Sequence, residues 1–246
     1  MENPLPPESL GHDAEHPISK VKEIVKIILG LFCLIIFLIF GRREILRIER
    51  EEHYKNIVSV SITIPEGFDL NQIADTAAPK LPNFNKSKFI LETKDREGYL
   101  FPDTYFFLNN MDETDVVKSM SDNFEKKITP LLPNITFSGK TEKEIIIMAS
   151  IIEGEAKGDT DRGIISGILW KRIKIGMPLE VDSAPETYKT KGLPENPIGN
   201  PGLKAIEAAI NPQASPYLYY LHDKNGNIHY AETFVLHEAN IKKYLK

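Results

Sequence analysis

Two glutamates at the end of an apolar run are the residues of this sequence best suited to acid–base chemistry. They are Glu153 and Glu155, in the stretch MASIIEGEAK over residues 148–157. On a helix, positions two apart point about 200° away from each other, so these carboxylates cannot form a pair in one pocket. Either one faces a cleft while the other faces solvent or a supporting partner, or the helix ends between them at Gly154.

The apolar neighbours of these glutamates suggest a proton donor. A carboxyl group set against apolar walls is poorly solvated as an anion, so it keeps its proton near neutral pH and can donate it to a leaving oxygen. Cleavage of a glycosidic bond needs that step. The alternative is a helix-end acid that forms an ion pair with Lys157 or Arg162. From the residues alone this second interpretation is the more common one, and both stay open.

The composition argues against several classes of protein. The chain has 246 residues, 41% of them hydrophobic, which allows one or two globular domains with a core. A formal charge of −5 argues against a nucleic-acid-binding protein, which would carry a basic face. The single cysteine, Cys33, excludes an intramolecular disulfide, and no HExxH or CxxC spacing occurs. We therefore expect neither a metal site nor a nucleic-acid partner.

One apolar segment predicts a membrane anchor. Residues 27–41 hold fifteen positions without a charge, and extending the run across Lys26 to Ile24 makes it eighteen. A spanning helix needs roughly 20 apolar residues, and a buried core helix rarely lacks a polar face over such a length. No small-residue cleavage site follows, so we expect an uncleaved transmembrane helix over residues 21–41. The flanking positive charges weakly favour a cytoplasmic location for the residues that follow it.

The rest of the chain alternates helical and extended patterns, which indicates an α+β fold. Apolar residues at every second position over 58–64 predict a half-buried strand, followed by a turn at Pro65-Glu66-Gly67. Capping boxes at Asp69 and Thr141 mark helix starts. Residues 1–20 are polar and proline-rich and predict a disordered tail. The expected helices are residues 69–79, 112–125, 141–157, 160–175, 202–210 and 234–245, with a loop over 176–202 and a hairpin over 217–233 that turns at Asn225-Gly226.

Five stretches, in this order, resemble the endolytic murein transglycosylases, the MltG or YceG-like family. They are TIPEGFDLNQIA (63–74), EGYLFPDTYFF (97–107), ASIIEGEA (149–156), GILWKRIKIGMPLEVD (167–182) and GLPENPIGNPGLKAIEAAINPQASPYLYYL (192–221). With the apolar segment they cover nearly the whole chain from residue 24 onward. The resemblance implies a cytoplasmic tail (1–20), a transmembrane helix (21–41), a stalk (42–57), a small LysM-like α+β subdomain (58–92) and a mixed α+β YceG-like catalytic domain (93–246).

The same resemblance implies an activity. Glu153 occupies the position of the family's catalytic glutamate. The family cleaves the β-1,4 bond between N-acetylmuramic acid and N-acetylglucosamine non-hydrolytically and leaves 1,6-anhydro ends. Because this reaction is proton transfer and intramolecular attack, no cofactor is expected.

The resemblance also implies a location and partners. It implies a single-pass protein of the plasma (inner) membrane with its catalytic domain outside the cytoplasm. This overrules the weak charge bias, because folded domains of this size translocate with little regard to it. The implied partners are peptidoglycan glycan strands, the membrane through residues 21–41 and, by family analogy, a peptidoglycan synthase complex.

Seven further residues are candidates for substrate binding, and most have a structural alternative. Asn200 could instead stabilise its loop, Thr187 and Tyr188 could serve packing, and Tyr99 belongs to an aromatic cluster typical of a core. His237 matches a family histidine, and we expect a structural role for it. The candidates are Glu97, Tyr99, Glu155, Asp182, Thr187, Tyr188 and Asn200.

The chain departs from the family's pattern directly after Asp182. The long segment that usually follows is shortened, and Glu186 stands where the family commonly has asparagine. The shortening removes part of a loop that would line the substrate. Two alternatives to a transglycosylase therefore stay open. One is a non-catalytic peptidoglycan-binding or division scaffold, and the other is a hydrolase that uses Glu153 with a distant carboxylate such as Asp182.

Overall fold

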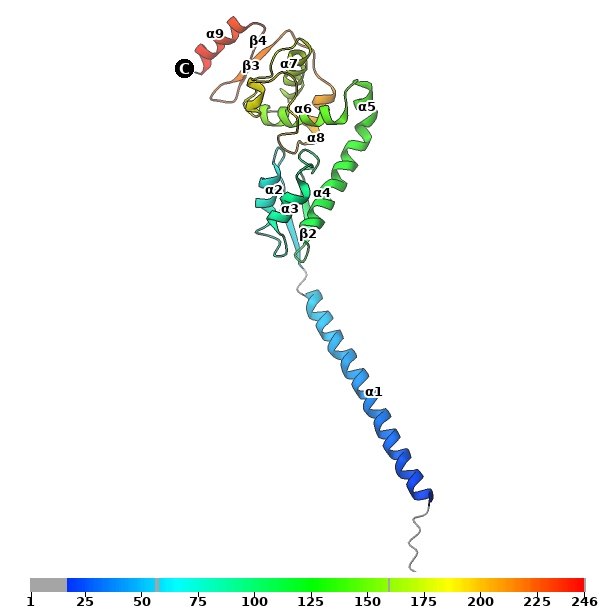
Figure 1. Cartoon of the computed structure of the whole chain (residues 1–246). Coiled ribbons are helices and arrows are strands. Elements are labelled where there is room, and N and C mark those ends of the chain that lie inside the picture. Colours follow the sequence, from blue (N-terminus) through cyan, green and yellow to red (C-terminus); the bar gives the residue numbers. More distant parts are fainter. Residues whose placement is uncertain (1–16, 56–57, 159, 246) are drawn as a thin grey trace, which may run out of the picture. The chain divides into compact units, whose positions relative to one another are not determined.

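The computed structural model describes residues 17–55, 58–158 and 160–245 (Figure 1). The chain divides into two compact units, one up to residue 57 and one from residue 58 onward. All residues that the sequence singled out for chemistry belong to the second unit. The two units are therefore considered separately.

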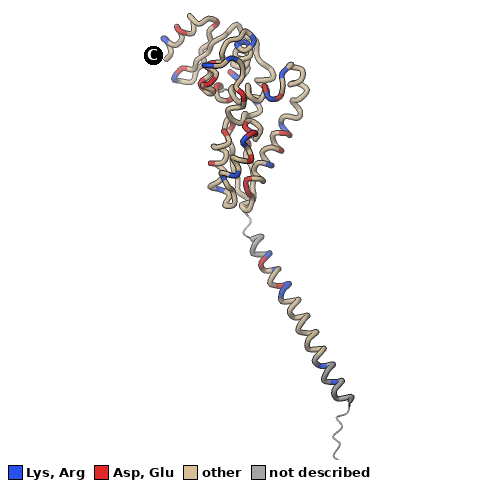
Figure 2. The backbone as a smooth tube through the Cα atoms, viewed as in Figure 1, with Lys and Arg blue, Asp and Glu red and all other residues tan. Residues whose placement is uncertain are grey.

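The first unit contains the helix α1 (Pro17–Lys55), which continues through the expected stalk. Its large apolar side chains over 28–40 are 38% to 73% exposed, and Figure 2 shows the charge-free stretch that they form. Among the described residues, no helix is both long and apolar enough to cross a membrane. Some side chains of the expected span at 21–41 lie outside the described residues. So does the tail expected over 1–20, except for its last four positions, which belong to α1.

The second unit begins with a two-stranded antiparallel sheet and three helices. The elements are β1 (Ser59–Thr63), α2 (Leu70–Ala77), α3 (Lys86–Thr93), β2 (Thr104–Leu108) and α4 (Glu113–Ile128). The predicted strand and the predicted helix 112–125 are confirmed as β1 and α4. The capping box at Asp69 is also confirmed, since its side chain accepts from the N–H of Gln72 at 2.8 Å. The end of the aromatic stretch 97–107 forms β2, which pairs with β1 so that Leu108 lies opposite Ser59. This strand was not predicted.

These five elements share one hydrophobic core. Each contributes at least one buried side chain, for example Ile62, Ile73, Phe89, Phe107 and Met120. An isolated two-stranded ribbon is at best marginally stable, so the sheet depends on the helices that pack against it. The core continues past residue 92, where the sequence predicted the small subdomain to end, because β1 finds its strand partner in β2.

A second core surrounds a helix that is buried on nearly all sides. α6 (Glu142–Glu155) starts at the predicted capping box of Thr141 and Glu144, and its side chains over 145–152 are at most 3% exposed. α7 (Arg162–Lys174) and α8 (Leu203–Ile210) pack against α6 (Figure 1). The central position predicted for this helix is therefore confirmed. The segment between α4 and α6 forms η1 (Thr129–Leu131) and α5 (Leu132–Phe137).

The C-terminal segment is a hairpin and a helix, as predicted, but its turn differs. The elements are β3 (Tyr219–His222), β4 (Ile228–Ala231) and α9 (Phe234–Tyr244), and the long loop before α8 contains η2 (Pro185–Tyr188). The two-residue turn predicted at Asn225-Gly226 is wrong, because the strands are joined by all of residues 223–227. The carboxylate of Asp223 accepts from the backbone N–H groups of Asn225 and Asn227, both at 2.9 Å. These local bonds stabilise a wider loop than the dipeptide suggested.

Candidate active site

Glu153 lies in the last turn of α6, and two donors hold its carboxylate. Arg162, at the start of α7, donates from Nη2 to Oε1 at 2.9 Å. The backbone N–H of Gly202, the N-cap of α8, donates to Oε2 at 3.0 Å. The side chain of Glu153 is 7% exposed. Because both donors belong to helices that pack on α6, helix packing sets the position of this carboxylate.

These contacts differ from the apolar walls expected around Glu153. The carboxylate contacts a guanidinium and a backbone N–H, and both are polar donors. The expected apolar surroundings are therefore wrong for this structure. The alternative drawn from the residues, an ion pair with Arg162, is present.

A second carboxylate, Glu66, approaches the same arginine from the turn after β1. Its Oε2 lies 4.0 Å from Nη2 of Arg162, and its side chain is 48% exposed. Gly67 has a φ of 82°, and a Cβ built there would lie 3.4 Å from Cγ of Glu153. The turn therefore packs directly against Glu153. The sequence predicted only a turn at residues 65–67, because no local pattern links it to the end of a distant helix.

Glu155 points to the other side of α6 and has its own partners. Its Oε1 accepts from the backbone N–H of Ser183 at 3.0 Å, and its Oε2 accepts from the hydroxyl of Tyr220 at 2.9 Å. Burial, and then the charge of Glu155, raise the pKa of Tyr220 well above its usual value. Since α6 continues to Glu155, the helix does not end at Gly154. The two glutamates are separate, as the helical spacing predicted.

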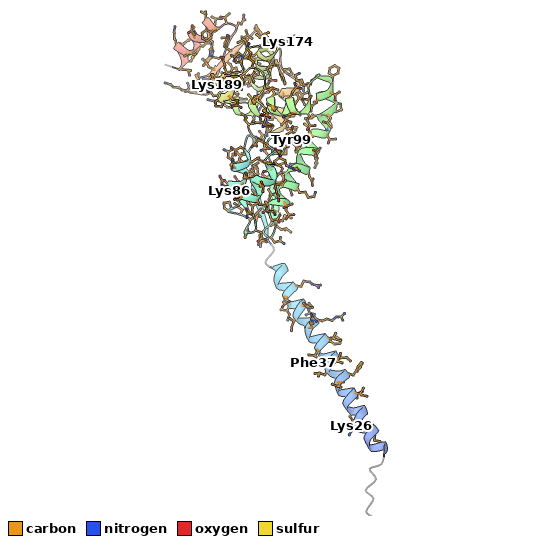
Figure 3. All side chains as sticks on the ribbon, viewed as in Figure 1. Lys26, Phe37, Lys86, Tyr99, Lys174 and Lys189 are labelled. Atoms are coloured by element: carbon orange, nitrogen blue, oxygen red, sulfur yellow. The ribbon has the colours of Figure 1, made fainter. Side chains whose placement is uncertain are left out.

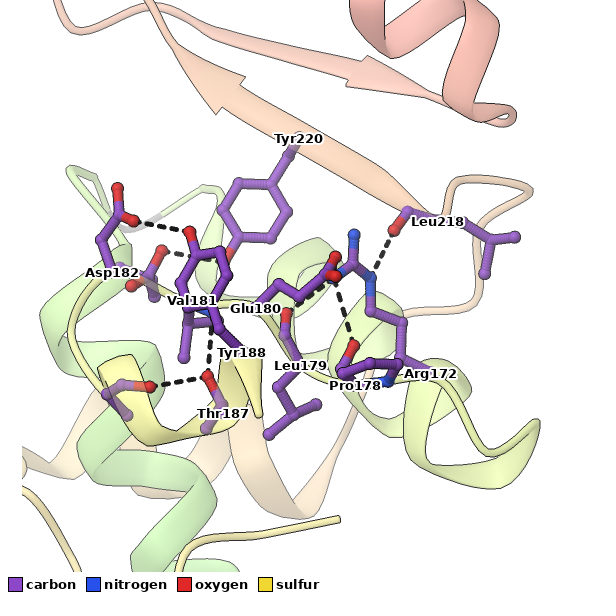
Figure 4. Close-up of polar contacts among 12 residues, drawn as sticks. Arg172, Pro178, Leu179, Glu180, Val181, Asp182, Thr187, Tyr188, Leu218 and Tyr220 are labelled. Carbon is purple, nitrogen blue, oxygen red and sulfur yellow. Dashed lines mark hydrogen bonds and ion pairs between the residues drawn. The ribbon is translucent and has the colours of Figure 1, made fainter. Parts of the chain in front are cut away.

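Glu155 lines a cleft of about 690 Å³ that also contains several tyrosines and histidines. At one wall the hydroxyl of Tyr188 donates to Oδ1 of Asp182 at 2.7 Å, and this bond raises the pKa of Tyr188 to about 12 (Figure 4). At another wall the ring of His237 stacks on that of Tyr219, with centroids 5.2 Å apart. In the described part of the chain, no three His, Cys, Asp or Glu side chains gather to hold a metal ion.

Arg172 fixes the wall of this cleft, and its role was not predicted. Its Nε donates to the carbonyl of Leu218 at 2.7 Å, and its Nη1 donates to that of Leu179 at 2.6 Å (Figure 4). The guanidinium lies over the ring of Tyr219, 5.0 Å from the centroid. One buried arginine thus joins α7 to the start of the hairpin and to the loop before η2.

Two of the predicted substrate-binding residues are fully buried, which favours the structural alternative for each. Asn200 is fully buried, with Oδ1 accepting from the N–H of Leu100 and Nδ2 donating to Phe68 and Glu97. Thr187 is also fully buried, and its hydroxyl donates to the carbonyl of Ala184 at 2.6 Å. Their polar groups are used inside the protein, so a sugar cannot reach them without opening these loops.

Glu97 and Tyr99 line a separate cleft of about 580 Å³. Tyr99, labelled in Figure 3, packs edge-on against Phe124 with ring centroids 5.2 Å apart. Glu97 accepts from Nδ2 of Asn200 at 2.8 Å and from the N–H of Leu70 at 3.2 Å. Burial is the largest cause that raises the pKa of Glu97, to about 7. Glu97 and Tyr99 therefore lie outside the cleft that Glu155 lines, and Glu153 does not line their cleft.

Comparison with known proteins defines the family of this fold. A sequence model of the YceG-like family matches residues 43–186 and 184–243. The chain belongs to the YceG-like family. The crystal structure of a YceG-like protein from Listeria monocytogenes superposes with a TM-score of 0.67 and 26% identity, over 73% of this chain and 75% of that one. The mixed α+β YceG-like fold is therefore confirmed.

Two curated relatives of this YceG-like chain bear the same name, endolytic murein transglycosylase. The relative from Bacillus subtilis (strain 168) is 28% identical over 75% of this chain and 65% of its own length. The relative from Streptococcus pneumoniae serotype 2 (strain D39) is 26% identical over 76% of this chain and 45% of its own length. The chain thus spans about half to two thirds of these relatives. The two parts of the family match meet at residues 184–186, where the loop after Asp182 is shortened.

Proposed function

We propose that this chain is a membrane-anchored endolytic peptidoglycan transglycosylase in which Glu153 is both acid and base. The observation that carries the proposal is the arrangement around this residue. In a YceG-like fold, Arg162 and the N–H of Gly202 orient its carboxylate at the end of a buried helix. The names of the two curated relatives support peptidoglycan as the substrate class.

One carboxyl group is sufficient for the proposed reaction. Protonated Glu153 gives its proton to the oxygen that bridges muramic acid and glucosamine, and the bond from this oxygen to C1 breaks. The substrate's N-acetyl group stabilises the cationic carbon. The Glu153 carboxylate then takes the proton of the C6 hydroxyl, whose oxygen bonds to C1 and closes the 1,6-anhydro ring. The proton returns to Glu153 and no water is consumed, in contrast to hydrolysis by a carboxylate pair.

We propose that the cleft beside Glu155 binds the glycan strand. Its tyrosines combine a flat apolar face with a polar tip, which suits the faces and hydroxyls of sugars. The carboxylates of Glu155 and Asp182 can accept from sugar hydroxyls in bonds that their charge strengthens. Gly154, the neighbour of Glu153 in sequence, is one of the residues that line the cleft. Glu97 and Tyr99 stay candidates for a more distant part of the substrate.

We also propose an anchor in the plasma membrane over residues 21–41, with the second unit outside the cytoplasm. The exposed apolar side chains over 28–40 support this, because such a long run on one helix is stable only when something apolar covers it. An enzyme held there would meet glycan strands as they are polymerised. A peptidoglycan synthase complex is the partner that this location favours.

The test of the function is Glu153→Gln in the full chain, with digestion of purified glycan and mass analysis of the new ends. General acid–base catalysis contributes about 10²–10⁴-fold, so we expect turnover to fall by that factor. The matched control is Glu92→Gln, a partly exposed glutamate on α3 that pairs with Lys88 at 3.7 Å. The control should keep wild-type turnover, and circular dichroism should show both variants folded. Wild-type turnover in Glu153→Gln would exclude it as the acid.

A hydrolase is the second candidate, because Glu66 supplies a second carboxylate. The oxygens of Glu66 and Glu153 lie 4.0 and 2.9 Å from the same Nη2 of Arg162. They are therefore no more than about 7 Å apart, and the carboxylate pairs of glycosidases are about 5–9.5 Å apart. Reducing ends among the products would favour hydrolysis, and 1,6-anhydro ends favour the transglycosylase. A non-catalytic peptidoglycan-binding scaffold would release no fragments.

A further inference from the structure

We propose that Glu180 is a substrate-binding residue of the cleft beside Glu155, and that its carboxylate accepts hydrogen bonds from hydroxyl or amide N–H groups of a glycan strand. The inference rests on the proposed function and adds to it a residue that the sequence did not single out. Glu180 lies in the loop between α7 and η2, and its side chain lines the cleft of about 690 Å³.

The backbone of Glu180 has an unusual conformation. Its φ is 49°, and within residues 17–55, 58–158 and 160–245 it is the one non-glycine residue with a positive φ. In this region the Cβ of an L-residue crowds the following carbonyl oxygen, a cost that glycine avoids. Residues that keep such strain are concentrated at ligand-binding and active sites. A glutamate here therefore needs a role that glycine could not fill.

The neighbours of Glu180 hold it in this conformation. Leu179 and Val181 are both buried in the core around α6. The carbonyl of Leu179 accepts from Nη1 of Arg172 at 2.6 Å, and the N–H of Val181 donates to the hydroxyl oxygen of Thr187 at 3.1 Å. With both flanking residues fixed in the core, the side chain of Glu180 is left to face the cleft.

The carboxylate of Glu180 keeps its capacity to accept hydrogen bonds. Its Oε2 lies 3.5 Å from Nη1 of Arg172, the side chain is 43% exposed, and no described residue donates a hydrogen bond to it (Figure 4). Glu155 and Asp182, which line the same cleft, already accept from protein donors. An ion pair with so exposed a partner contributes little to stability, so the contact with Arg172 does not explain the strained glutamate.

The surroundings of this carboxylate suit an uncharged sugar. The guanidinium of Arg172 lies over the ring of Tyr219, and the ring of His237 stacks on the same tyrosine. Burial, and then the charge of Arg172, lower the pKa of His237, which favours the neutral ring near neutral pH. Aromatic rings can pack against the apolar faces of a sugar, and a charged acceptor beside them can bind its hydroxyl groups. Glu180 supplies that acceptor.

The first test measures binding, with fluorescently labelled glycan strands freed of peptides and the full chain carrying Glu153→Gln as the parent, so that the strands stay intact. Adding Glu180→Gly removes the acceptor and should raise Kd about tenfold. Adding Glu180→Gln keeps an oxygen acceptor without the charge and should raise Kd about threefold. The control is Glu186→Gln, at an exposed residue of η2 that does not line the cleft, and it should match the parent. An unchanged Kd in Glu180→Gly would overturn the inference.

The second test is urea denaturation, which separates a binding role from a structural one. Glycine relieves the strain at a φ of 49°, so Glu180→Gly should have a urea midpoint at least as high as that of wild type. The matched control is Glu186→Gly, on the same loop at a residue without a positive φ, and its midpoint should be lower than that of wild type. If Glu180→Gly lowers the midpoint as Glu186→Gly does, the glutamate serves stability and the inference is wrong.

Cleavage assays then distinguish this inference from the proposed function. In the chain that retains Glu153, Glu180→Gly should raise KM for glycan about tenfold and leave kcat little changed, as expected for lost substrate binding. If the chain binds glycan without cleaving it, and Glu180→Gly weakens that binding, the proposed function fails and the binding site stands. If the chain cleaves glycan and Glu180→Gly changes neither Kd nor KM, the inference fails alone. If the parent chain binds no glycan, both fail.

Discussion

Replacement of Glu97 by glutamine should change how the stability of the protein depends on pH. Glu97 accepts from the amide of Asn200 and from the N–H of Leu70, the first residue of α2, and so joins three segments of the chain. Burial raises the pKa of this carboxyl from 4.5 to about 7, and the charge of Asp69 acts in the same direction. The hydrogen bond from Leu70 acts against it without cancelling it. Glutamine keeps an acceptor for Asn200 and cannot ionise.

The sign of the effect follows from the raised pKa. Between about 4.5 and 7 the folded state binds more protons at Glu97 than the unfolded state does, so the stability that this residue contributes falls as pH rises. It is fully present below the unfolded pKa and is lost as the pH passes the folded one. A shift of this size corresponds to about 3 kcal/mol at most. Because the side chain is partly exposed to water, we expect about 1–2 kcal/mol.

The assay is urea denaturation of wild type and Glu97→Gln at a series of pH values. The free energy of unfolding of wild type should fall relative to the variant, by about 1–2 kcal/mol, as the pH rises from below 4.5 to above 7. A constant offset between the two curves reflects the altered hydrogen bond to Leu70 and does not bear on the titration. Glu92→Gln provides the control, with a curve parallel to wild type. Parallel curves for wild type and Glu97→Gln would refute the argument.

Two further substitutions test the cleft beside Glu155. Tyr220→Phe removes the hydroxyl that donates to Oε2 of Glu155 at 2.9 Å, and should lower the free energy of unfolding by about 1–2 kcal/mol. Arg172→Lys removes the planar group that donates to Leu218 and Leu179, and should cost about 1–3 kcal/mol. Both are measured by urea denaturation, and a variant as stable as wild type would show that its bonds contribute nothing net.

The parts of the fold that the sequence predicted depend on local patterns. The capping boxes at Asp69 and Thr141 involve residues three apart, so the sequence contains all of the information. The burial of α6 follows from an apolar run that leaves no polar face. The strand β2 was missed because its partner β1 lies far away in sequence. Its aromatic pattern alone fitted a core cluster equally well.

The candidate site was harder to predict because its contacts are between distant segments. Glu153 was singled out by its position in a motif, but its partner Gly202 and its neighbour Glu66 come from other parts of the chain. A backbone N–H and a glutamate in a turn have no sequence signature. For Asn200 the sequence left two roles open, ligand binding or stabilisation of its loop, and the contacts of its amide with three segments favour the second.

The shortened segment after Asp182 bears on whether the cleft can still function. The few residues that remain form the compact helix η2, with Thr187 bonded to Val181 and Ala184. Val181 and Ala184 are themselves at most 2% exposed, and the N–H of Ser183 holds Glu155. A loop that had lost its structure through the shortening would lack this burial and these hydrogen bonds. We therefore expect the shortening to change how much of a glycan strand the cleft covers, and to leave the carboxylate of Glu153 where α7 and α8 hold it.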